Sequence, residues 1–465
     1  DRMAEGYGPN APALVSLATR GATLIVCVDC GTAAAAALDS VRGRADVVVL
    51  DHHKAEGPPP PVAATVNPNR LDCASGLNTL CAAGIAFLTA VAVVRALRRR
   101  GFFPTRDAEP DLLRLLDLVA LATVCDVMPL TGLNRALVRQ GLKVMARRAR
   151  PGIAALLEVA QTRDRPNTST CGFGLGPRIN AAGRISEADL GIRLLLCEDP
   201  VEARTLACLL DSVNRQRQEV EASMLDDALR IAEEQAAAGH PALLICGPAW
   251  HPGVVGIVAG RVKERFNRPA CVAGIADRLA KGSGRSLPGL DLGSAIIAAR
   301  QAGILSTGGG HPMAAGFSLI ADRQADFHVF LNERLAAASQ LPSAADLPIE
   351  GALSVLGATP ELAHHLARLA PFGNGNEEPV FVIQRARVVR ADRVGREGTA
   401  IRAFLEGEGG GARLKAMLFR AREGALAEVL LNRTGTPLHV AGHLRTEDWN
   451  GGTSAGFVLC DGALA

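Results

Sequence analysis

Aromatic residues, lysine and long apolar runs are all scarce in this 465-residue chain. Aromatic side chains make up only 3% of it, and five of its 50 basic residues are lysine. The resulting richness in arginine and alanine follows GC-rich coding and says little about function. The formal net charge of +3 is nearly neutral, so it neither requires nor excludes a nucleic-acid partner.

The longest apolar run, Leu80–Val94, is too short to cross a bilayer at about 1.5 Å per residue. We interpret it as a buried helix, and since no signal peptide is visible we expect no membrane partner. Eleven cysteines, an odd number scattered through apolar stretches, indicate reduced thiols in the cytoplasm. Cys27 and Cys30 have C-x-x-C spacing, but no second pair follows at zinc-site spacing, so we interpret them as small core residues.

Two short apolar runs, Ala22–Val28 and Val47–Leu50, predict neighbouring parallel strands that are buried on both faces. The alanine-rich stretch Ala33–Arg42 between them is long enough for a crossover helix. The expected unit is therefore strand–helix–strand with a right-handed connection. Ligands of such sheets bind beyond the carboxyl ends of the strands, which is where polar residues follow both runs.

Asp29 closes the first run, and Asp51, His52 and His53 follow the second. Oxygen ligands combined with a single imidazole suit Mn²⁺ or Mg²⁺ better than a structural zinc. We predict Asp29, His52 and Asp126 as metal ligands, because a carboxylate bridging two ions about 4 Å apart helps activate water and clamp a phosphoryl group. The alternatives are a surface loop for the Asp-His-His triplet and a plain helix-end carboxylate for Asp126.

Three stretches rich in small residues, Thr307–Phe317, Lys281–Ser286 and Gly174–Arg184, are predicted as loops that cradle phosphates. The predicted nucleic-acid contacts in them are Arg178, Asn180, Arg184, Ser283, Arg285, Ser286, Gly309, Gly310 and His311. Plain turns are the alternative for the glycine loops. The alternative for the third stretch is a loop that ends the domain, with an arginine that pairs with Glu187 or Asp189. Trp250 could stack on a base or pack in a core.

Along the chain, the pattern predicts an α/β parallel-sheet domain at 1–205, a connecting helix at 206–240 and a second α/β domain at 241–340. A Pro/Ser/Ala linker at Leu341–Ala345 then leads to an OB-like β-barrel at 346–465. The predicted helices and strands lie at 79–99, 112–124, 133–148, 188–238, 380–390, 401–405, 414–419, 438–443 and 456–459.

Together these stretches resemble the RecJ family, the single-strand-specific 5′→3′ DNA exonucleases of the DHH phosphoesterase superfamily. The Asp-His-His triplet marks only the superfamily, whereas Gly176–Arg184 and the C-terminal region narrow the resemblance to RecJ. The matching pieces run in family order: Glu5–Gly8, Val28–Gly31, Leu50–His53, Asp117–Asp126, Gly176–Arg184, Gly282–Ser286, Gly309–Gly316 and Pro371–Asn376. The resemblance implies a DHH domain, a second domain like DHHA1 and an OB-like barrel.

It also implies metal-dependent exonuclease activity on single-stranded DNA in recombination and repair. Asp29 would bridge two Mn²⁺ or Mg²⁺ ions, and His52 and Asp126 would hold one of them. His53 would contact the scissile phosphate, with Asp51 as the second catalytic residue. Arg285 and the Gly-Gly-His loop would grip the strand, and a narrow passage between the two α/β domains would admit one strand. A single-strand-binding protein or a helicase would be possible partners.

One family motif is missing, an Asp-x-Asp on the first strand that should precede Glu5. The chain opens at Asp1 inside what looks like a folded segment, so we expect a truncated N-terminus and a fragment that binds single strands but cleaves them poorly. One rival function is a DHH phosphodiesterase of short oligonucleotides, against which the C-terminal β region argues. The other is a non-catalytic single-strand-binding scaffold, against which the intact Asp29, His52 and Asp126 argue.

Overall fold

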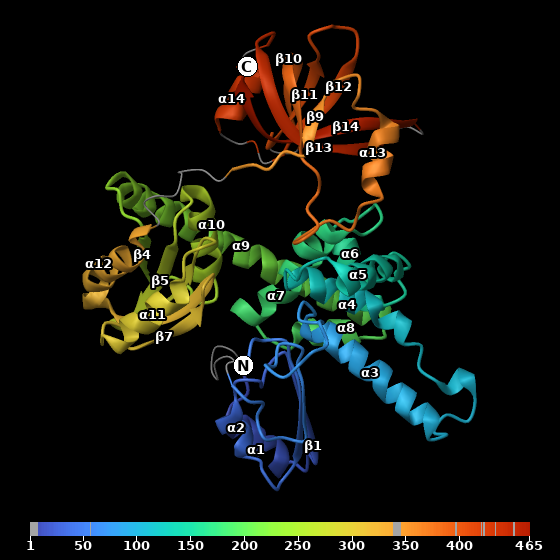
Figure 1. Ribbon diagram of the computed structural model, residues 1–465, viewed down its shortest axis with the longest axis vertical. Helices are drawn as coiled ribbons and strands as arrows, with labels where there is room; N and C mark the ends of the chain where they lie inside the picture. The colour runs from blue at the N-terminus through green and yellow to red at the C-terminus, as the bar shows by residue number, and fades with distance from the viewer. Residues whose placement is uncertain are drawn as a thin grey trace. The chain divides into compact units, whose positions relative to one another are not determined.

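The computed structural model describes residues 8–55, 57–337, 346–395, 398–419, 421, 424–432, 434–449 and 452–465. They form two compact units, each built from segments that are distant in sequence (Figure 1). One unit holds Gly8–Arg147, Arg165–Gly172 and Leu347–Ala465, and the other holds Arg148–Asp164 and Phe173–Asp346. The motif residues 5–7 and the predicted linker Leu341–Ala345 lie outside the described residues.

A three-stranded parallel sheet opens the first unit, in the order β1-β2-β3. Its strands and the two helices beside β1 in Figure 1 are β1 (Leu24–Val28), β2 (Asp46–Leu50), β3 (Ala64–Val66), α1 (Ala11–Thr19) and α2 (Ala35–Asp39). Leu14 of α1 and Leu38 of α2 pack on one face of the sheet against Ile25 and Val49. The predicted strand–helix–strand unit is therefore present, although α2 is shorter than the expected crossover helix.

The prediction that both strands are buried on both faces is wrong for β1. Its alternate side chains Leu24, Val26 and Val28 are 56%, 48% and 57% exposed. The helices α1 and α2 cover only the opposite face, and within the described residues nothing buries this one. β2 differs because Leu50 is buried in a second cluster formed with α3 and α4.

Helices follow the sheet: α3 (Ala82–Arg99), the 3₁₀ turns η1 (Arg106–Ala108) and η2 (Leu112–Leu115), α4 (Leu116–Cys125) and α5 (Gly132–Met145). The predicted buried helix is confirmed only for the first turns of α3, since Ile85 and Phe87 are buried but Val91 and Val93 are exposed. Gly141 lets α5 approach α4 closely, because a Cβ there would lie 2.1 Å from the carbonyl oxygen of Leu116. No helix in the described part of the chain combines the length and apolar character needed to cross a membrane.

The second unit begins with helices and continues into a mixed sheet. The helices are α6 (Pro151–Val159), α7 (Gly176–Ile185), α8 (Leu190–Leu196) and the 38-residue α9 (Pro200–Ala237), with a π-helical segment η3 (Thr170–Leu175) preceding α7. The carboxylate of Asp199 caps α9 by accepting a hydrogen bond from the Val201 amide at 2.8 Å. α9 packs against α6, α7 and α8 and also against α10 and β4, so it is the expected long connecting helix.

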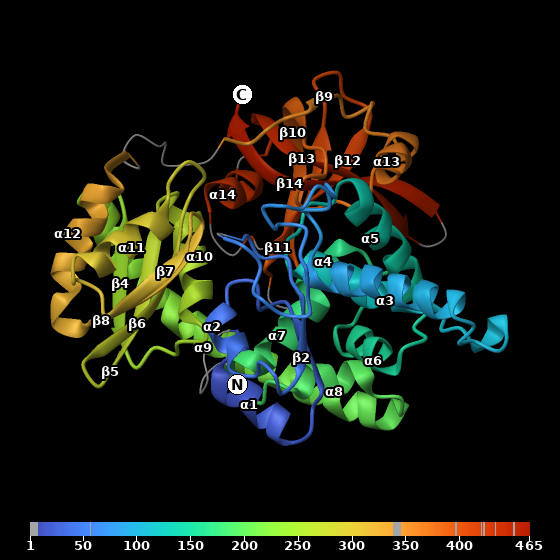
Figure 2. The same cartoon turned by 60° about the horizontal axis from the view of Figure 1, so that its bottom comes forward.

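The mixed sheet has the order β4-β5-β6-β8-β7, with only β4 and β5 parallel. Leu243 and Ile245 point from β4 toward α9 and α10, whereas Leu244 between them points toward α11 and α12, as strand alternation requires. Helices therefore cover both faces, and the layers are visible in Figure 2. The bounds are β4 (Leu243–Pro248), α10 (Val255–Phe266), β5 (Ala270–Ala276), β6 (Leu279–Arg285), α11 (Leu292–Gln301), β7 (Thr307–His311), β8 (Ala314–Ile320), η4 (Ala321–Arg323) and α12 (Gln324–Arg334).

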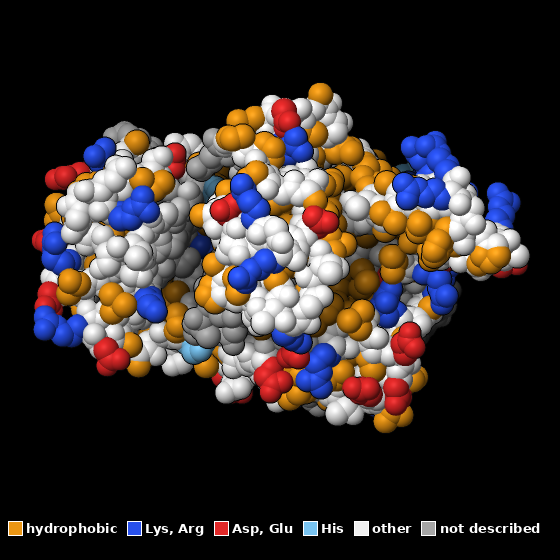
Figure 3. Space-filling view, turned by 90° about the horizontal axis from the view of Figure 1, so that it is seen from below, with side chains coloured by type: hydrophobic (Ala, Val, Ile, Leu, Met, Phe, Trp, Pro, Cys, Tyr) orange, Lys and Arg blue, Asp and Glu red, His pale blue; other side chains and the backbone are white. Residues whose placement is uncertain are grey.

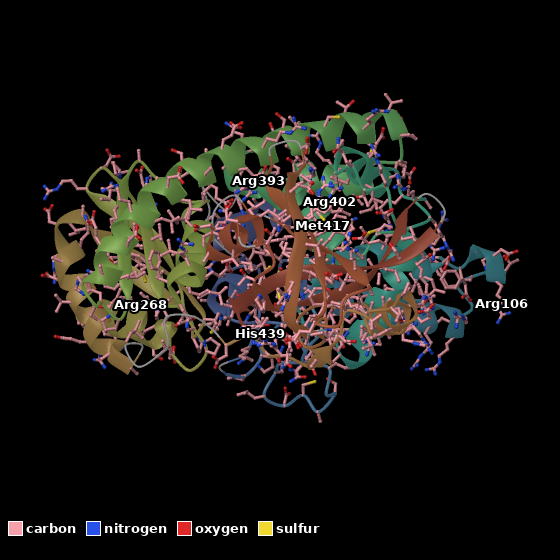
Figure 4. All side chains as sticks on the ribbon, turned by 90° about the horizontal axis from the view of Figure 1, so that it is seen from above. Arg106, Arg268, Arg393, Arg402, Met417 and His439 are labelled. Carbon is pink, nitrogen blue, oxygen red and sulfur yellow. The ribbon has the colours of Figure 1, made fainter. Side chains whose placement is uncertain are left out.

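The C-terminal part of the first unit is a closed barrel. β10 pairs with both β11 and β13, and the ring continues through β12 and β14, which confirms an OB-like architecture. Arg393, Arg402 and Met417, labelled in Figure 4, lie on β10, β11 and β12, and Arg402 and Met417 are register partners. The bounds are β9 (Gly351–Leu353), α13 (Pro360–Ala367), β10 (Phe381–Val394), β11 (Ala400–Glu406), β12 (Arg413–Leu418), α14 (Ala425–Asn432), β13 (Pro437–Trp449) and β14 (Gly452–Leu464).

Candidate metal centre and strand-binding residues

Asp29 and His52 leave the carboxyl ends of two adjacent parallel strands. Asp29 follows β1 with φ 59°, a left-handed conformation that aspartate tolerates better than most side chains. Its amide donates a 2.9 Å hydrogen bond to the carbonyl of Leu50, the last residue of β2. The turn that ends β1 is thereby fixed next to the turn that carries the Asp-His-His triplet.

Two carboxylates converge on one imidazole in this structure. The Nε2 atom of His52 lies 3.1 Å from Oδ1 of Asp29 and 3.4 Å from Oδ2 of Asp126. Asp126 reaches this point because it is the C-cap residue of α4. Ligand atoms of Asp29, His52 and His53 also lie within 4.8 Å of one another. The structure thus brings all three predicted metal ligands together and adds His53 beside them.

The electrostatics of this cluster suit a cation. The hydrogen bond to Asp29 raises the pKa of His52 against the opposing effect of burial, and Asp126 raises it further. Burial, together with the charge of Asp29, raises the pKa of Asp126. Two half-exposed carboxylates and a nearly buried imidazole are the oxygen and nitrogen donors that Mn²⁺ and Mg²⁺ accept, so these residues fit such an ion.

Asp51 lies under the triplet and is only 1% exposed. Its carboxylate accepts hydrogen bonds from the Thr32 amide at 3.0 Å, the His52 amide at 2.8 Å and His53 Nδ1 at 2.7 Å. Burial alone would raise the pKa of Asp51, but the bonds from Thr32 and His53 lower it to about 2. The carboxylate is thus ionised and directed at the loop that it supports.

Two asparagines complete this support, and the sequence reasoning missed them. Asn67 Nδ2 donates to Thr32 Oγ1 and to the His53 carbonyl, both at 2.8 Å. Asn69 Nδ2 donates to the His52 carbonyl at 2.6 Å. The signal was available, because both asparagines follow β3, a third parallel strand whose carboxyl end lies at the same edge of the sheet.

The predicted phosphate-binding residues lie in the other compact unit. Gly174–Arg184 is predicted as a loop, but most of it forms the helix α7. This helix packs against α9. Arg178 forms an ion pair with Asp211 of α9 at 2.8 Å, so its acidic partner is neither of the two expected from the sequence. Arg184 donates to the carbonyl of Gly253 at 2.8 Å, and Asn180 is exposed.

The other two predicted loops are strands. Lys281–Ser286 belongs mostly to β6, where Arg285 donates a 2.9 Å hydrogen bond to Ser283 Oγ. Ser286 follows with 1% of its surface exposed, and its hydroxyl donates to the Leu290 carbonyl, which removes it from any surface that a strand could reach. Glycine is needed at position 282 for packing, because a Cβ there would lie 2.3 Å from the Phe317 ring.

Thr307–Phe317 forms the hairpin β7–β8, in which Gly309 pairs with Gly316. A Cβ at either position would meet nothing within 4 Å, so this pair leaves bare backbone on the hairpin surface. Gly310 and His311 are exposed beside it. Trp250 instead packs over Gly247 and Gly274, which favours the core alternative for this residue.

The face drawn in Figure 3 carries both basic and acidic side chains among apolar ones. The formal net charge of the whole chain is +3. A net charge this small gives little overall attraction to a polyanion, so particular side chains would matter more.

Comparison with known proteins gives matches to three parts of the chain. Three families match: the DHH family, N-terminal domain, at residues 2–123, the DHHA1 domain at 239–337 and the RecJ OB domain at 349–461. The chain is 41% identical to the single-stranded-DNA-specific exonuclease RecJ of Dickeya dadantii and 39% identical to that of Escherichia coli. Each comparison covers 90% of this chain and 74% of the relative.

Solved structures agree with this. The crystal structure of RecJ in complex with Mn²⁺ from Thermus thermophilus matches with a TM-score of 0.79 and 29% identity, over 97% of this chain and 63% of that one. A structure of exonuclease RecJ bound to manganese matches with a TM-score of 0.60 and 33% identity, over 74% of this chain and 82% of that one. The order of the matched families, the acidic and histidine residues at the end of the sheet and these identities lead to one conclusion: the chain belongs to the RecJ family.

Proposed function

We propose that this protein is a metal-dependent exonuclease that hydrolyses phosphodiester bonds of single-stranded DNA from the 5′ end. The convergence of Asp29 and Asp126 on His52 is the observation that carries the proposal. Its relatives are named single-stranded-DNA-specific exonucleases, and solved relatives hold Mn²⁺ or Mg²⁺. Two such ions, Mn²⁺ or Mg²⁺, are the proposed cofactor.

Asp29, His52 and Asp126 would hold the metal ions, with Asp29 as the bridging carboxylate. Bound there, the ions would supply a water molecule of lowered pKa and neutralise charge on the phosphate. His53 would contact the scissile phosphate. Asp51 is better described as a positioning residue than as a catalytic one, because its carboxylate is buried against the loop and holds the His53 ring.

Strand binding is assigned to the second unit. Ser283 and Arg285 on β6, and Gly309, Gly310 and His311 on β7, would contact backbone phosphates. The bare backbone at Gly309 supports this, because a phosphate can approach an amide there without meeting a side chain. Asn180 and Arg184 would extend the contact. Arg178 would act by orienting α7, since its guanidinium is already bound to Asp211.

The test uses the protein carrying the expected Asp-x-Asp strand, incubated with Mn²⁺ and with single strands labelled at either end, which are then separated by length. Release of the 5′ label as mononucleotides before the 3′ label is expected, with duplexes of the same sequence resistant. Preferential hydrolysis of dinucleotides and very short strands would instead establish a phosphodiesterase of short oligonucleotides. Tight binding without cleavage would establish a non-catalytic scaffold, and the Asp29→Ala variant serves as the contamination control in all three cases.

We propose that the protein acts in DNA recombination and repair in the cytoplasm, with a single-strand-binding protein or a helicase as partners. An exonuclease of this polarity needs a partner that exposes or protects single strands, which is what those two classes do. Stimulation of cleavage on a partly duplex substrate by a purified helicase would test this. The eleven free cysteines support the reducing compartment.

The proposed domain boundaries are 1–205, 206–240, 241–340 and 346–465. The matched family ranges support them, since 2–123 and 349–461 lie within the first and last, and 239–337 nearly coincides with the third.

A further inference from the structure

The turn that presents Asp126 is held in an unfavourable backbone conformation. Val127, the residue after this ligand, has φ 55°. The left-handed region at a helix end normally takes glycine or asparagine, and a β-branched side chain is a rare occupant. Val127 is also 67% exposed, so burial of its own side chain does little to stabilise the turn. The amides of Val127 and Met128 close the turn by donating to the carbonyls of Val124 and Thr123, both at 3.1 Å, and a further contact comes from outside the helix.

A loop of the barrel region supplies the contact. The segment Pro371–Asn376 lies between α13 and β10, and the Nδ2 atom of Asn374 donates a 2.8 Å hydrogen bond to the carbonyl of Val127. The carbonyl of Asn374 in turn accepts a 2.7 Å bond from the Leu130 amide. One residue, 247 positions from Val127 along the chain, thus binds both ends of the segment that follows Asp126.

Glycine on both sides of Asn374 makes this approach possible. A Cβ at Gly373 would lie 2.8 Å from Cδ1 of Leu130. Gly375 has φ 72°, and a Cβ there would lie 3.3 Å from Cβ of Pro129. A side chain at Gly373 would therefore require the Leu130 side chain to shift, and one at Gly375 would strain the loop.

The loop itself is closed by several internal hydrogen bonds. Asn376 Nδ2 donates to the carbonyls of Leu369 at 3.1 Å and Pro371 at 2.8 Å. Gly373 and Asn376 exchange two backbone hydrogen bonds of 3.0 Å. Asn374 is consequently presented from a fixed scaffold, and its hydrogen bonds can restrain the turn instead of following it.

We propose that Asn374 is a positioning residue for the metal centre: by clamping the strained turn at Val127, the barrel-side loop keeps the Asp126 carboxylate directed at His52. This assignment rests on the proposed metal-dependent function. It makes the metal affinity of the DHH domain depend on a residue in the loop that precedes β10. The barrel region would then contribute to catalysis as well as to strand binding.

The experiment compares Asn374→Ala and Asn374→Asp with the parent chain, measuring Mn²⁺ affinity by electron paramagnetic resonance and then kcat and KM on a short single strand. Both variants should bind Mn²⁺ about 10-fold more weakly and lose kcat, with KM little changed, as expected when an outer partner of a ligand is removed. Adding Val127→Gly to Asn374→Ala should restore most of the affinity, because glycine adopts the left-handed turn without a clamp.

Arg135→Ala is the matched control. Arg135 of α5 donates to the carbonyl of Leu369, so this change removes another contact between the same two regions without touching the turn after Asp126. It should leave Mn²⁺ affinity unchanged. The assignment would be overturned if Arg135→Ala and Asn374→Ala lost equal Mn²⁺ affinity, or if Val127→Gly restored none of it. Either result would show that the loop only stabilises the fold in general. Parent-like affinity in both Asn374 variants would also overturn it, whereas a parent that binds no Mn²⁺ would overturn the proposed function together with it.

Discussion

The Nδ1 atom of His53 lies 2.7 Å from Oδ1 of Asp51, a carboxylate that solvent barely reaches. Because Asp51 is ionised, the imidazole donates from Nδ1, and Nε2 is then the basic nitrogen of the ring. The same carboxylate also holds the backbone of Thr32 and His52. One buried charge therefore sets the tautomer of His53 and the shape of the loop that carries the metal ligand.

Asp51→Asn tests this relationship. The amide keeps the size of the side chain but replaces one acceptor oxygen by a donor, which opposes the Thr32 and His53 donors. We expect turnover to fall about 10- to 100-fold, as for other partners that orient metal-site histidines. Circular dichroism should remain unchanged. Asp39→Asn, on the exposed surface of α2, is the control and should retain full activity. If Asp51→Asn is as active as the parent, orientation of His53 by Asp51 does not contribute to catalysis.

In the protein carrying the expected Asp-x-Asp strand, Asp29→Ala should abolish hydrolysis while leaving the fold intact. The side chain is 59% exposed at the end of β1, so its removal creates no cavity. Loss of a bridging carboxylate removes both water activation and charge stabilisation, so the rate should fall by orders of magnitude. Asp46→Ala is the matched control, since Asp46 is exposed at the opposite end of the same sheet. Near-parental turnover of Asp29→Ala in saturating Mn²⁺ would disprove the ligand assignment.

Much of the metal site could be predicted because it depends on strand topology alone. Parallel strands deliver their carboxyl ends to one edge, so Asp29 and His52 had to be neighbours once β1 and β2 were recognised. Asp126 is different, since only the packing of α4 brings it to within 3.4 Å of His52. The contact of Asn374 with Val127 had no local signal at all, because the residues of a whole second unit separate the two along the chain.

The glycine-rich stretches show why composition misleads. Position 284 of β6 requires glycine because a Cβ there would come within 2.6 Å of the Leu292 side chain. Position 310 of β7 requires glycine because a Cβ there would come within 2.5 Å of the Ala314 carbonyl oxygen. Such glycines are required by close contacts with distant residues or with the paired strand, and not by a turn at their own position. A single sequence does not distinguish glycine for close packing from glycine for a flexible loop.

Arg285→Ala should weaken binding to all single strands about equally. Phosphate contacts carry no sequence information, and removal of one such contact should reduce the slope of log affinity against log salt by about 0.7. Fluorescence anisotropy over a salt series, on two unrelated sequences, measures both quantities. Arg278→Ala is the control, because Arg278 is exposed at the β5–β6 turn and pairs with Asp322. An unchanged affinity and slope in Arg285→Ala would mean that the strand does not pass over β6.

The junction of β4 with α12 should loosen in acid. His328 Nε2 bonds the Ala242 carbonyl at 3.0 Å, and its ring lies 4.7 Å from that of His240. Asn332, one turn further along α12, accepts from the Ala242 amide at 3.0 Å and lies 3.1 Å from His240 Nδ1. Burial, and to a smaller extent His240, lowers the pKa of His328 below its usual 6.5, so the fold favours the neutral imidazole.

The direction of the pH effect follows from this lowered pKa. Because the unfolded chain binds the proton more tightly, the stabilisation from His328 is complete above about pH 6.5 and declines as the pH falls toward the lower folded pKa. Amide exchange at Ala242 should therefore accelerate between about pH 7.5 and pH 5 beyond the intrinsic change. His328→Gln, which cannot be charged, should flatten this dependence, whereas His364→Gln on the exposed face of α13 should not. If the parent and His328→Gln show the same pH dependence, the imidazole of His328 is not the group that titrates.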